Sequence, residues 1–133
     1  MICSRIFMSA IALFSMATVN AQNQVTMSTT NYAVEIIRYT IADGERNSFE
    51  TAYSSAGTIL QSSSYCLGYE IIHGTDETAN YIVRIHWTSV EDHLNGFRKS
   101  KEFMAFFNLV KPFYNDIREM KHYEQTSAVW TRR

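Results

Sequence analysis

The stretch that most constrains the fold lies toward the C-terminal end, where aromatic and aliphatic residues recur at spacings of three and four. Such spacing places side chains on one stripe of a helix with about 3.6 residues per turn. The stripe comprises Phe103, Phe106, Phe107, Val110, Tyr114 and Ile117. Because it needs a broad apolar surface to pack against, we expect a helix from about Ser100 that covers a sheet, with Pro112 either kinking or restarting it.

Four other segments have the β-branched and aromatic content of strands. They are residues 32–41, 65–74, 80–87 and 120–129. The second and third predict an antiparallel hairpin. Between the first two, apolar residues at helical spacing over 49–60 follow a turn and N-cap signal at Asp43 and Gly44. The order strand, helix, strand, strand, helix, strand predicts a ferredoxin-like α+β domain, with both helices on one face of a four-stranded antiparallel sheet.

The first 21 residues have the features of a secretory signal peptide. Arg5 supplies the positive charge, residues 6–19 are almost wholly apolar, and Ala21 ends the cleavage pattern. This apolar run is shorter than the roughly 20 residues that a membrane-spanning helix needs. We therefore expect an exported protein, periplasmic or secreted, with a flexible leader over residues 22–31, one domain over 32–129 and no membrane association after cleavage.

The charge balance argues against a nucleic-acid partner. The chain has 12 basic and 13 acidic residues, and 11 basic residues remain when Arg5 leaves with the signal. Binding to phosphates requires a concentrated basic face, which this balance does not predict. The four histidines lack HxH or HxxxH spacing and Cys66 is alone after cleavage, so the sequence predicts no metal site. We expect Cys66 to be a small buried strand residue, with a reactive thiol as the alternative.

The first predicted strand is apolar on both faces. Ala33, Ile37 and Tyr39 alternate with Val34 and Ile36. Two helices are too few to cover both faces of a four-stranded sheet. We therefore expect a second copy of the chain on the other face, which makes the protein a homodimer.

Several short stretches resemble the antibiotic biosynthesis monooxygenase (ABM) family. Residues 69–71 resemble the family's second strand, and residues 87–89, followed by Ser100 and the phenylalanines of the stripe, resemble its tryptophan, helix and serine–phenylalanine pattern. The resemblance extends over residues 32–126 and implies domains that pair into a dimeric α+β barrel. Phe97 stands where many family members have a histidine, three residues before the serine.

The resemblance implies that small phenolic or quinol compounds are oxidised by oxygen without metal, haem or flavin, so we expect no cofactor. Such chemistry needs an apolar cavity for an aromatic ring, a base, and donors for developing charge. We expect His93 and His122 to be the catalytic bases, because imidazoles ionise near neutral pH. The candidate substrate-binding residues are Arg38, Tyr69, Trp87, Phe97 and Phe107.

The candidates also have structural interpretations. Trp87 at a strand end would fill the core, and His93 would be an exposed turn residue or a cap. His122 would be hydrogen-bonded across the dimer barrel. Arg38 would form a salt bridge with an acid such as Glu70 or Glu124.

Two other functions stay open at this point. The first is a non-catalytic dimeric domain that binds a small aromatic ligand. The second is a haem-degrading relative, because one histidine is enough for an axial ligand. We expect His73 and His86 to be structural or exposed in every case.

Overall fold

The computed structural model describes residues 32–132, so the predicted signal peptide and leader lie outside the described residues. The regular elements are β1 (Ala33–Thr40), α1 (Arg46–Ser62), β2 (Cys66–His73), β3 (Asn80–Trp87), α2 (Lys101–Val110) and β4 (Ile117–Glu124). Short helical turns join them: η1 (Asp43–Glu45), the π-helical η2 (Asp92–Gly96), η3 (Phe97–Lys99) and η4 (Lys111–Asp116). The predicted order of strands and helices is confirmed.

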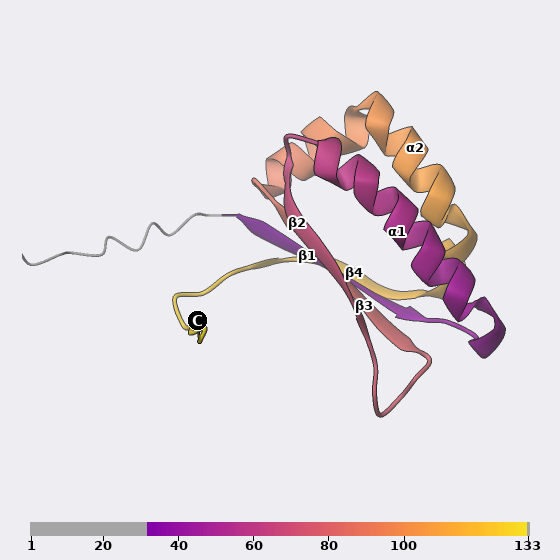
Figure 1. The fold of residues 1–133 in the computed structure, drawn as a ribbon. Helices are drawn as coiled ribbons and strands as arrows, with labels where there is room; N and C mark the ends of the chain where they lie inside the picture. The colour runs from indigo at the N-terminus through magenta and orange to yellow at the C-terminus, as the bar shows by residue number, and fades with distance from the viewer. Residues whose placement is uncertain (1–31, 133) are drawn as a thin grey trace, which may run out of the picture.

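The four strands form one antiparallel sheet in the order β2-β3-β1-β4. Both α1 and α2 lie over the same face of this sheet (Figure 1). The ferredoxin-like α+β fold expected from the sequence is therefore observed. Among residues 32–132, no helix combines the length and the apolar character needed to cross a membrane.

The core lies between the sheet and the two helices. Along β3, every second residue from Tyr81 to Trp87 is buried, as the period of two in a strand requires. Phe49 of α1 lies at the centre, with ring centroids 4.9 Å from Tyr39, 4.8 Å from Tyr81 and 5.2 Å from Phe113. Aromatic rings from three segments of the chain therefore hold α1 against the sheet.

The aromatic stripe is divided among three elements instead of one helix. The helix α2 ends at Val110, Tyr114 lies in η4, and Ile117 is the first residue of β4. Pro112 occupies the first turn of η4, where a missing N–H costs no helical hydrogen bond. The helix begins where predicted, because the Ser100 hydroxyl accepts a hydrogen bond from the Phe103 amide.

Two predicted boundaries were wrong. The first helix does not begin at an Asp43 or Gly44 cap, because η1 precedes it and no side-chain hydrogen bond caps α1. The last strand spans Ile117–Glu124, not residues 120–129. Its end follows from pairing, since Glu124 lies opposite Ala33, the first residue of β1. A strand cannot continue its ladder past the end of its partner.

Candidate functional site

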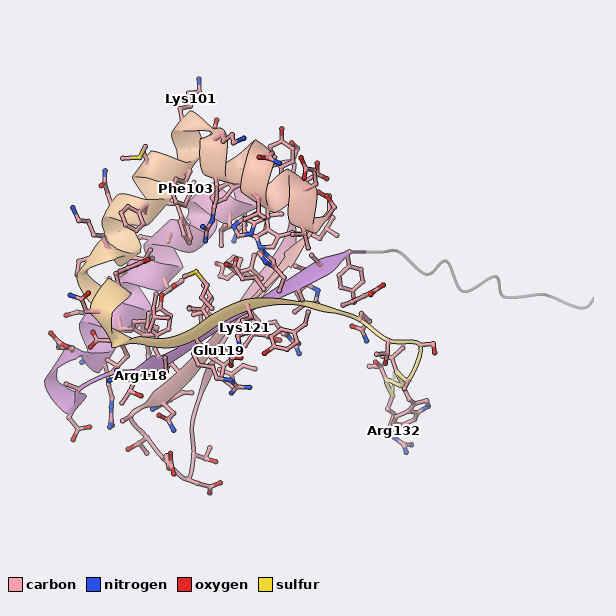
Figure 2. All side chains as sticks on the ribbon, turned by 180° about the vertical axis from the view of Figure 1, so that it is seen from behind. Lys101, Phe103, Arg118, Glu119, Lys121 and Arg132 are labelled. Atoms are coloured by element: carbon pink, nitrogen blue, oxygen red, sulfur yellow. The ribbon has the colours of Figure 1, made fainter. Side chains whose placement is uncertain are left out.

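A cavity of about 200 Å³ lies between the sheet and α2. Strands β1, β3 and β4 form its floor, and α2 and η4 supply phenylalanine, valine and tyrosine side chains. Phe103 is one of these side chains and lies on the inner side of α2, whereas Lys101 points away from the domain (Figure 2). Only two lining residues are charged, Glu35 and Arg98. Such an apolar pocket with few polar groups is the usual form of a small-molecule site.

Glu35 is the buried charge at this cavity. It alternates with Ala33 and Ile37 on the inner face of β1, and only 2% of its surface is exposed. The Trp87 indole N–H donates a hydrogen bond to Glu35 Oε2 at 3.0 Å. Arg98 Nη2 lies 3.9 Å from Glu35 Oε1. Burial raises the pKa of Glu35 above its usual value, and the Trp87 hydrogen bond and the Arg98 charge oppose this rise.

His93 is packed behind Glu35 and is equally buried. Its ring stacks on Trp87, with centroids 4.3 Å apart and planes 3° from parallel. Its Nε2 lies 3.6 Å from Glu35 Oε2 and accepts a hydrogen bond from Arg98 Nε at 3.3 Å. Burial and the positive charge of Arg98 lower the pKa of His93 to about 3, so its imidazole is neutral at pH 7 and its contact with Glu35 is not an ion pair.

Hydrogen bonds between neighbouring residues hold the turn that carries His93. The Ser89 hydroxyl accepts a hydrogen bond from the Asp92 amide, and the Thr88 hydroxyl donates to the Asp92 carboxylate. These two hydrogen bonds hold the start of the turn, with Ser89 as the acceptor and Asp92 as the acid. The π-helical turn that follows aims His93 inward instead of leaving it exposed.

His122 completes the group from β4. It lies opposite Glu35 in the β1–β4 ladder, so both side chains emerge on the inner face of the sheet. His122 Nε2 forms a 2.7 Å hydrogen bond with His93 Nδ1. Burial and the charge of Arg98 lower the pKa of His122. The structure thus brings the two predicted bases together, although no described histidine lines the main cavity.

One ligand atom from each of Glu35, His93 and His122 lies within 4.8 Å of the others, close enough to suggest a cation site. The sequence spacing did not predict this grouping, because the three residues lie on different elements. The contacts fit a cation poorly. The two histidine nitrogens share a proton at 2.7 Å, and the Arg98 guanidinium donates to His93 and repels positive charge. The group is therefore a hydrogen-bonded network.

Of the five predicted substrate-binding residues, only some line the cavity. Trp87 and Phe107 line the cavity. Phe97 is buried behind it, with its ring 4.9 Å from Trp87 and 5.6 Å from Phe106. Tyr69 does not line the cavity, because its ring lies against Gly57 of α1, where a Cβ would fall 1.9 Å from the Tyr69 hydroxyl.

Arg38 lies on the opposite face of the sheet from the cavity. Its Nε forms a 2.8 Å salt bridge with Glu119 of the neighbouring strand β4. The expected partners Glu70 and Glu124 were wrong, since Glu70 pairs with Arg84. Glu119 lies directly opposite Arg38 in the ladder, and such cross-strand neighbours are close enough for their side chains to meet.

The remaining predicted residues are placed as follows. His86 faces away from Trp87, as expected, and stacks against Tyr32 with ring centroids 5.3 Å apart. His73 is exposed next to its turn. Cys66 is half-buried instead of fully buried, and this burial raises the pKa of its thiol.

Three features of the site were not predicted from the sequence. Glu35 was not chosen, although an acid among alternating apolar residues of a strand is a signal of a buried carboxylate. Arg98 was not named as a candidate either. The third feature is the buried pair of tyrosines in the cavity wall, Tyr39 and Tyr53, whose hydroxyls are 2.6 Å apart. No short spacing connects these two residues.

Comparison with known proteins places this chain in a family. The chain is 27% identical over 84 residues to the uncharacterized protein YczJ of Bacillus subtilis strain 168, a match that covers 63% of this chain and 88% of that protein. A proposed antibiotic biosynthesis monooxygenase of Bordetella bronchiseptica has the same fold, with a TM-score of 0.61, 19% identity and coverage of 74% of this chain and 99% of that one.

SnoaB, a cofactor-independent oxygenase from Streptomyces nogalater, also shares the fold, with a TM-score of 0.57 and 12% identity over 75% of this chain and 96% of SnoaB. The model of the family called antibiotic biosynthesis monooxygenase matches residues 33–109, more than half of the chain. This match spans β1 to α2 and includes Glu35, Trp87, His93 and Arg98. The chain therefore belongs to the antibiotic biosynthesis monooxygenase family.

Proposed function

We propose that this protein is a cofactor-independent monooxygenase that oxidises a small phenolic or quinol compound in the cavity between the sheet and α2. The observation that carries the proposal is a buried carboxylate, Glu35, that faces an aromatic-lined cavity beside one guanidinium, Arg98. Membership of the family and the shared fold with an oxygenase that needs no cofactor support the type of reaction. The size of the cavity supports a small aromatic substrate.

In this proposal Glu35 is the base, in place of the two histidines expected from the sequence. It lines the cavity, whereas neither His93 nor His122 does. Burial raises its pKa toward the range in which a carboxylate removes protons effectively near neutral pH. Glu35 takes the hydroxyl proton of the substrate, and the electron pair of the broken O–H bond stays on the substrate as a phenolate.

The phenolate then supplies electrons to oxygen. In the oxygenase reaction, one oxygen atom replaces a ring hydrogen to give a quinone and the other leaves as water. A quinol instead gives up two electrons and two protons, and oxygen leaves as hydrogen peroxide. Arg98 stabilises the anion, because a guanidinium keeps its charge at any ordinary pH. Trp87 and Phe107 hold the ring through apolar contact.

We also propose that the protein is exported and forms a homodimer through the sheet face that the helices leave open. That face carries Ile36, Ile72 and Ile82, together with the Arg38–Glu119 salt bridge. Apolar side chains on an open sheet face gain free energy when a partner covers them. Light scattering at micromolar concentration should give the mass of a dimer, and a monomer would contradict this part of the proposal.

Oxygen uptake by the mature protein, residues 22–133, tests the activity with a panel of hydroquinones and phenols. We expect uptake above buffer with at least one compound, and its loss in Glu35→Gln. The matched control is Glu45→Gln, an exposed acid of η1 that should leave uptake unchanged. Tight binding of the same compounds without uptake would favour a non-catalytic binding domain. A Soret band on titration with haem, without uptake, would favour a haem-degrading relative.

A further inference from the structure

The network behind the cavity connects two separate hollows. The main cavity is lined by Glu35, whereas His122 lines a second hollow of about 280 Å³ at the end of the sheet, beside Ser89 and Tyr123. His93 lines neither hollow and lies between them. Its Nε2 is 3.6 Å from Glu35 Oε2 and its Nδ1 is 2.7 Å from His122 Nε2.

We propose that His93 and His122 form a proton relay that carries the substrate proton from Glu35 to water in the second hollow. The source of the proton in this relay rests on the proposed function, because Glu35 takes it from the substrate. The arrangement of the three residues is independent of that function, since the contacts from Glu35 through His93 to His122 are present in the folded chain itself.

Arg98 sets the direction of the hydrogen bonds in this relay. A guanidinium has no lone pair to offer, so its Nε must donate and His93 Nε2 must accept. His93 therefore carries its proton on Nδ1 and donates it to His122 Nε2. This leaves the His122 proton on Nδ1. The single lone pair of His93 Nε2 thus lies near both Arg98 Nε at 3.3 Å and Glu35 Oε2 at 3.6 Å, so the Arg98 hydrogen bond must break before Nε2 receives a proton from the protonated acid.

The transfer balances in atoms and charge. The protonated Glu35 gives its proton to His93 Nε2, His93 gives its Nδ1 proton to His122 Nε2, and His122 gives its Nδ1 proton to water. Glu35 returns to a carboxylate, one proton has reached solvent and no electrons have moved. Rotation or re-protonation of the two rings restores the starting tautomers.

The charges around His93 favour passing a proton onward instead of holding it on the imidazole. The groups that face His93 are Glu35 from β1, Trp87 from β3, Arg98 from η3 and His122 from β4. Burial and Arg98 hold the pKa of His93 at about 3 and also lower that of His122. An imidazolium is therefore disfavoured at both positions, so a proton that enters at His93 Nε2 must leave at Nδ1. A group that only stored the proton would need the opposite shift.

The first experiment needs no substrate. Nitrogen-15 NMR of the histidine rings in the wild-type protein distinguishes the two neutral tautomers. We expect both His93 and His122 to carry the proton on Nδ1 at pH 7. A proton on Nε2 of His93, or a charged ring at either position, would overturn the relay whatever the protein catalyses.

The second experiment follows the proton itself with 4-nitrophenol, an electron-poor phenol whose anion is yellow. In stopped-flow mixing with a pH-indicator dye, the wild type should form the anion and release a proton to solvent at the same rate. His122→Ala should bind 4-nitrophenol with unchanged affinity but release the proton roughly tenfold or more slowly. Added imidazole should restore the rate, which it would not do for a purely structural histidine.

The control is His86→Ala, which removes a β3 histidine from the opposite face of the sheet and should change neither rate. Unchanged proton release in His122→Ala, or slow release that imidazole does not restore, would overturn the relay. Failure of the wild type to form the anion would instead count against Glu35 as the base. In that case the nitrogen-15 NMR of the histidine tautomers alone would test the relay. The relay and the role of Glu35 as the base can therefore fail independently of each other.

Discussion

The indole nitrogen of Trp87, at the end of β3, donates its hydrogen bond to the carboxylate of Glu35 on β1, 52 residues earlier in the chain. Both side chains are buried at 2% exposure or less. A buried indole N–H and a buried carboxylate each need a partner, and here each satisfies the other. This bond fixes Glu35 at the wall of the cavity and moderates its pKa.

Removal of this donor should raise the pKa of Glu35 further. Trp87→Phe keeps an aromatic ring in the core but cannot donate a hydrogen bond to the ionised acid, so the carboxylate becomes less favourable. Carbon-13 NMR of the Glu35 carboxyl group during a pH titration measures the change. Trp130→Phe, at an exposed tryptophan near the C-terminus, is the matched control. An unchanged pKa in Trp87→Phe would show that the hydrogen bond does not tune Glu35.

Glu35→Gln should lose activity but gain stability. Because burial raises the pKa of Glu35, the folded chain holds the carboxylate charge less readily than the unfolded chain. Its ionisation therefore lowers the free energy of unfolding as pH rises above about 4.5. The neutral amide avoids this cost, so we expect a higher free energy of unfolding at pH 8 than in the wild type. Urea unfolding at pH 8 and pH 4 measures it, and an equal gain at both pH values would contradict the explanation.

His93 should make the domain sensitive to acid. Its pKa is lowered to about 3, so below about pH 6.5 the unfolded chain binds a proton that the folded chain does not. This difference reduces the free energy of unfolding by about 1.4 kcal/mol per pH unit as pH falls toward 3. Glu35 acts with the opposite sign between its raised pKa and about 4.5.

The contribution of His93 is therefore measured as the difference between the unfolding curves of the wild type and His93→Gln from about pH 6.5 to pH 4. We expect a smaller loss of stability on acidification in the variant. His73→Gln, at an exposed histidine, is the control and should follow the wild type. Parallel curves for the wild type and His93→Gln would show that this imidazole ionises freely in the folded protein.

The hydroxyl pair of Tyr39 and Tyr53 should behave as one unit. Each buried hydroxyl satisfies the other at 2.6 Å, so Tyr39→Phe leaves Tyr53 without this partner and should cost about 1–2 kcal/mol. Adding Tyr53→Phe should cost less than it does alone. Denaturant unfolding of the four proteins of the cycle measures the coupling, and Tyr114→Phe, at an exposed tyrosine of η4, is the control. Additive losses would contradict the pairing.

Alkaline pH offers a separate test of the same pair. Burial raises the pKa of Tyr39 to about 12 and that of Tyr53 well above its usual value. From about pH 10 upward the unfolded tyrosines therefore release protons that the folded ones keep, and the free energy of unfolding should fall. This fall should be smaller in the double phenylalanine variant.

Local patterns were enough to predict the ferredoxin-like fold. The alternation of β1 and β3 and the helical spacing of the apolar residues in α1 and α2 reflect periods of two and 3.6, which neighbouring residues express directly. The Ser100 cap was also readable, because a cap and its helix are adjacent in the chain. Boundaries were predicted less well. The end of β4 depends on where β1 begins, which is a property of the pairing.

The site depended on distances that no local pattern records. The elements follow from local patterns, and the alternation along β1 places Glu35 on the inner face of the sheet. The position of Glu35 at the cavity and the contact of His93 with His122 behind it depend on how distant segments pack together. The β1–β4 ladder places His122 opposite Glu35, and the π-helical turn adds His93, so residues 29 to 87 positions apart share one buried network. Burial then shifts the two kinds of group in opposite directions, because a dry environment raises the pKa of an acid and lowers that of an imidazole.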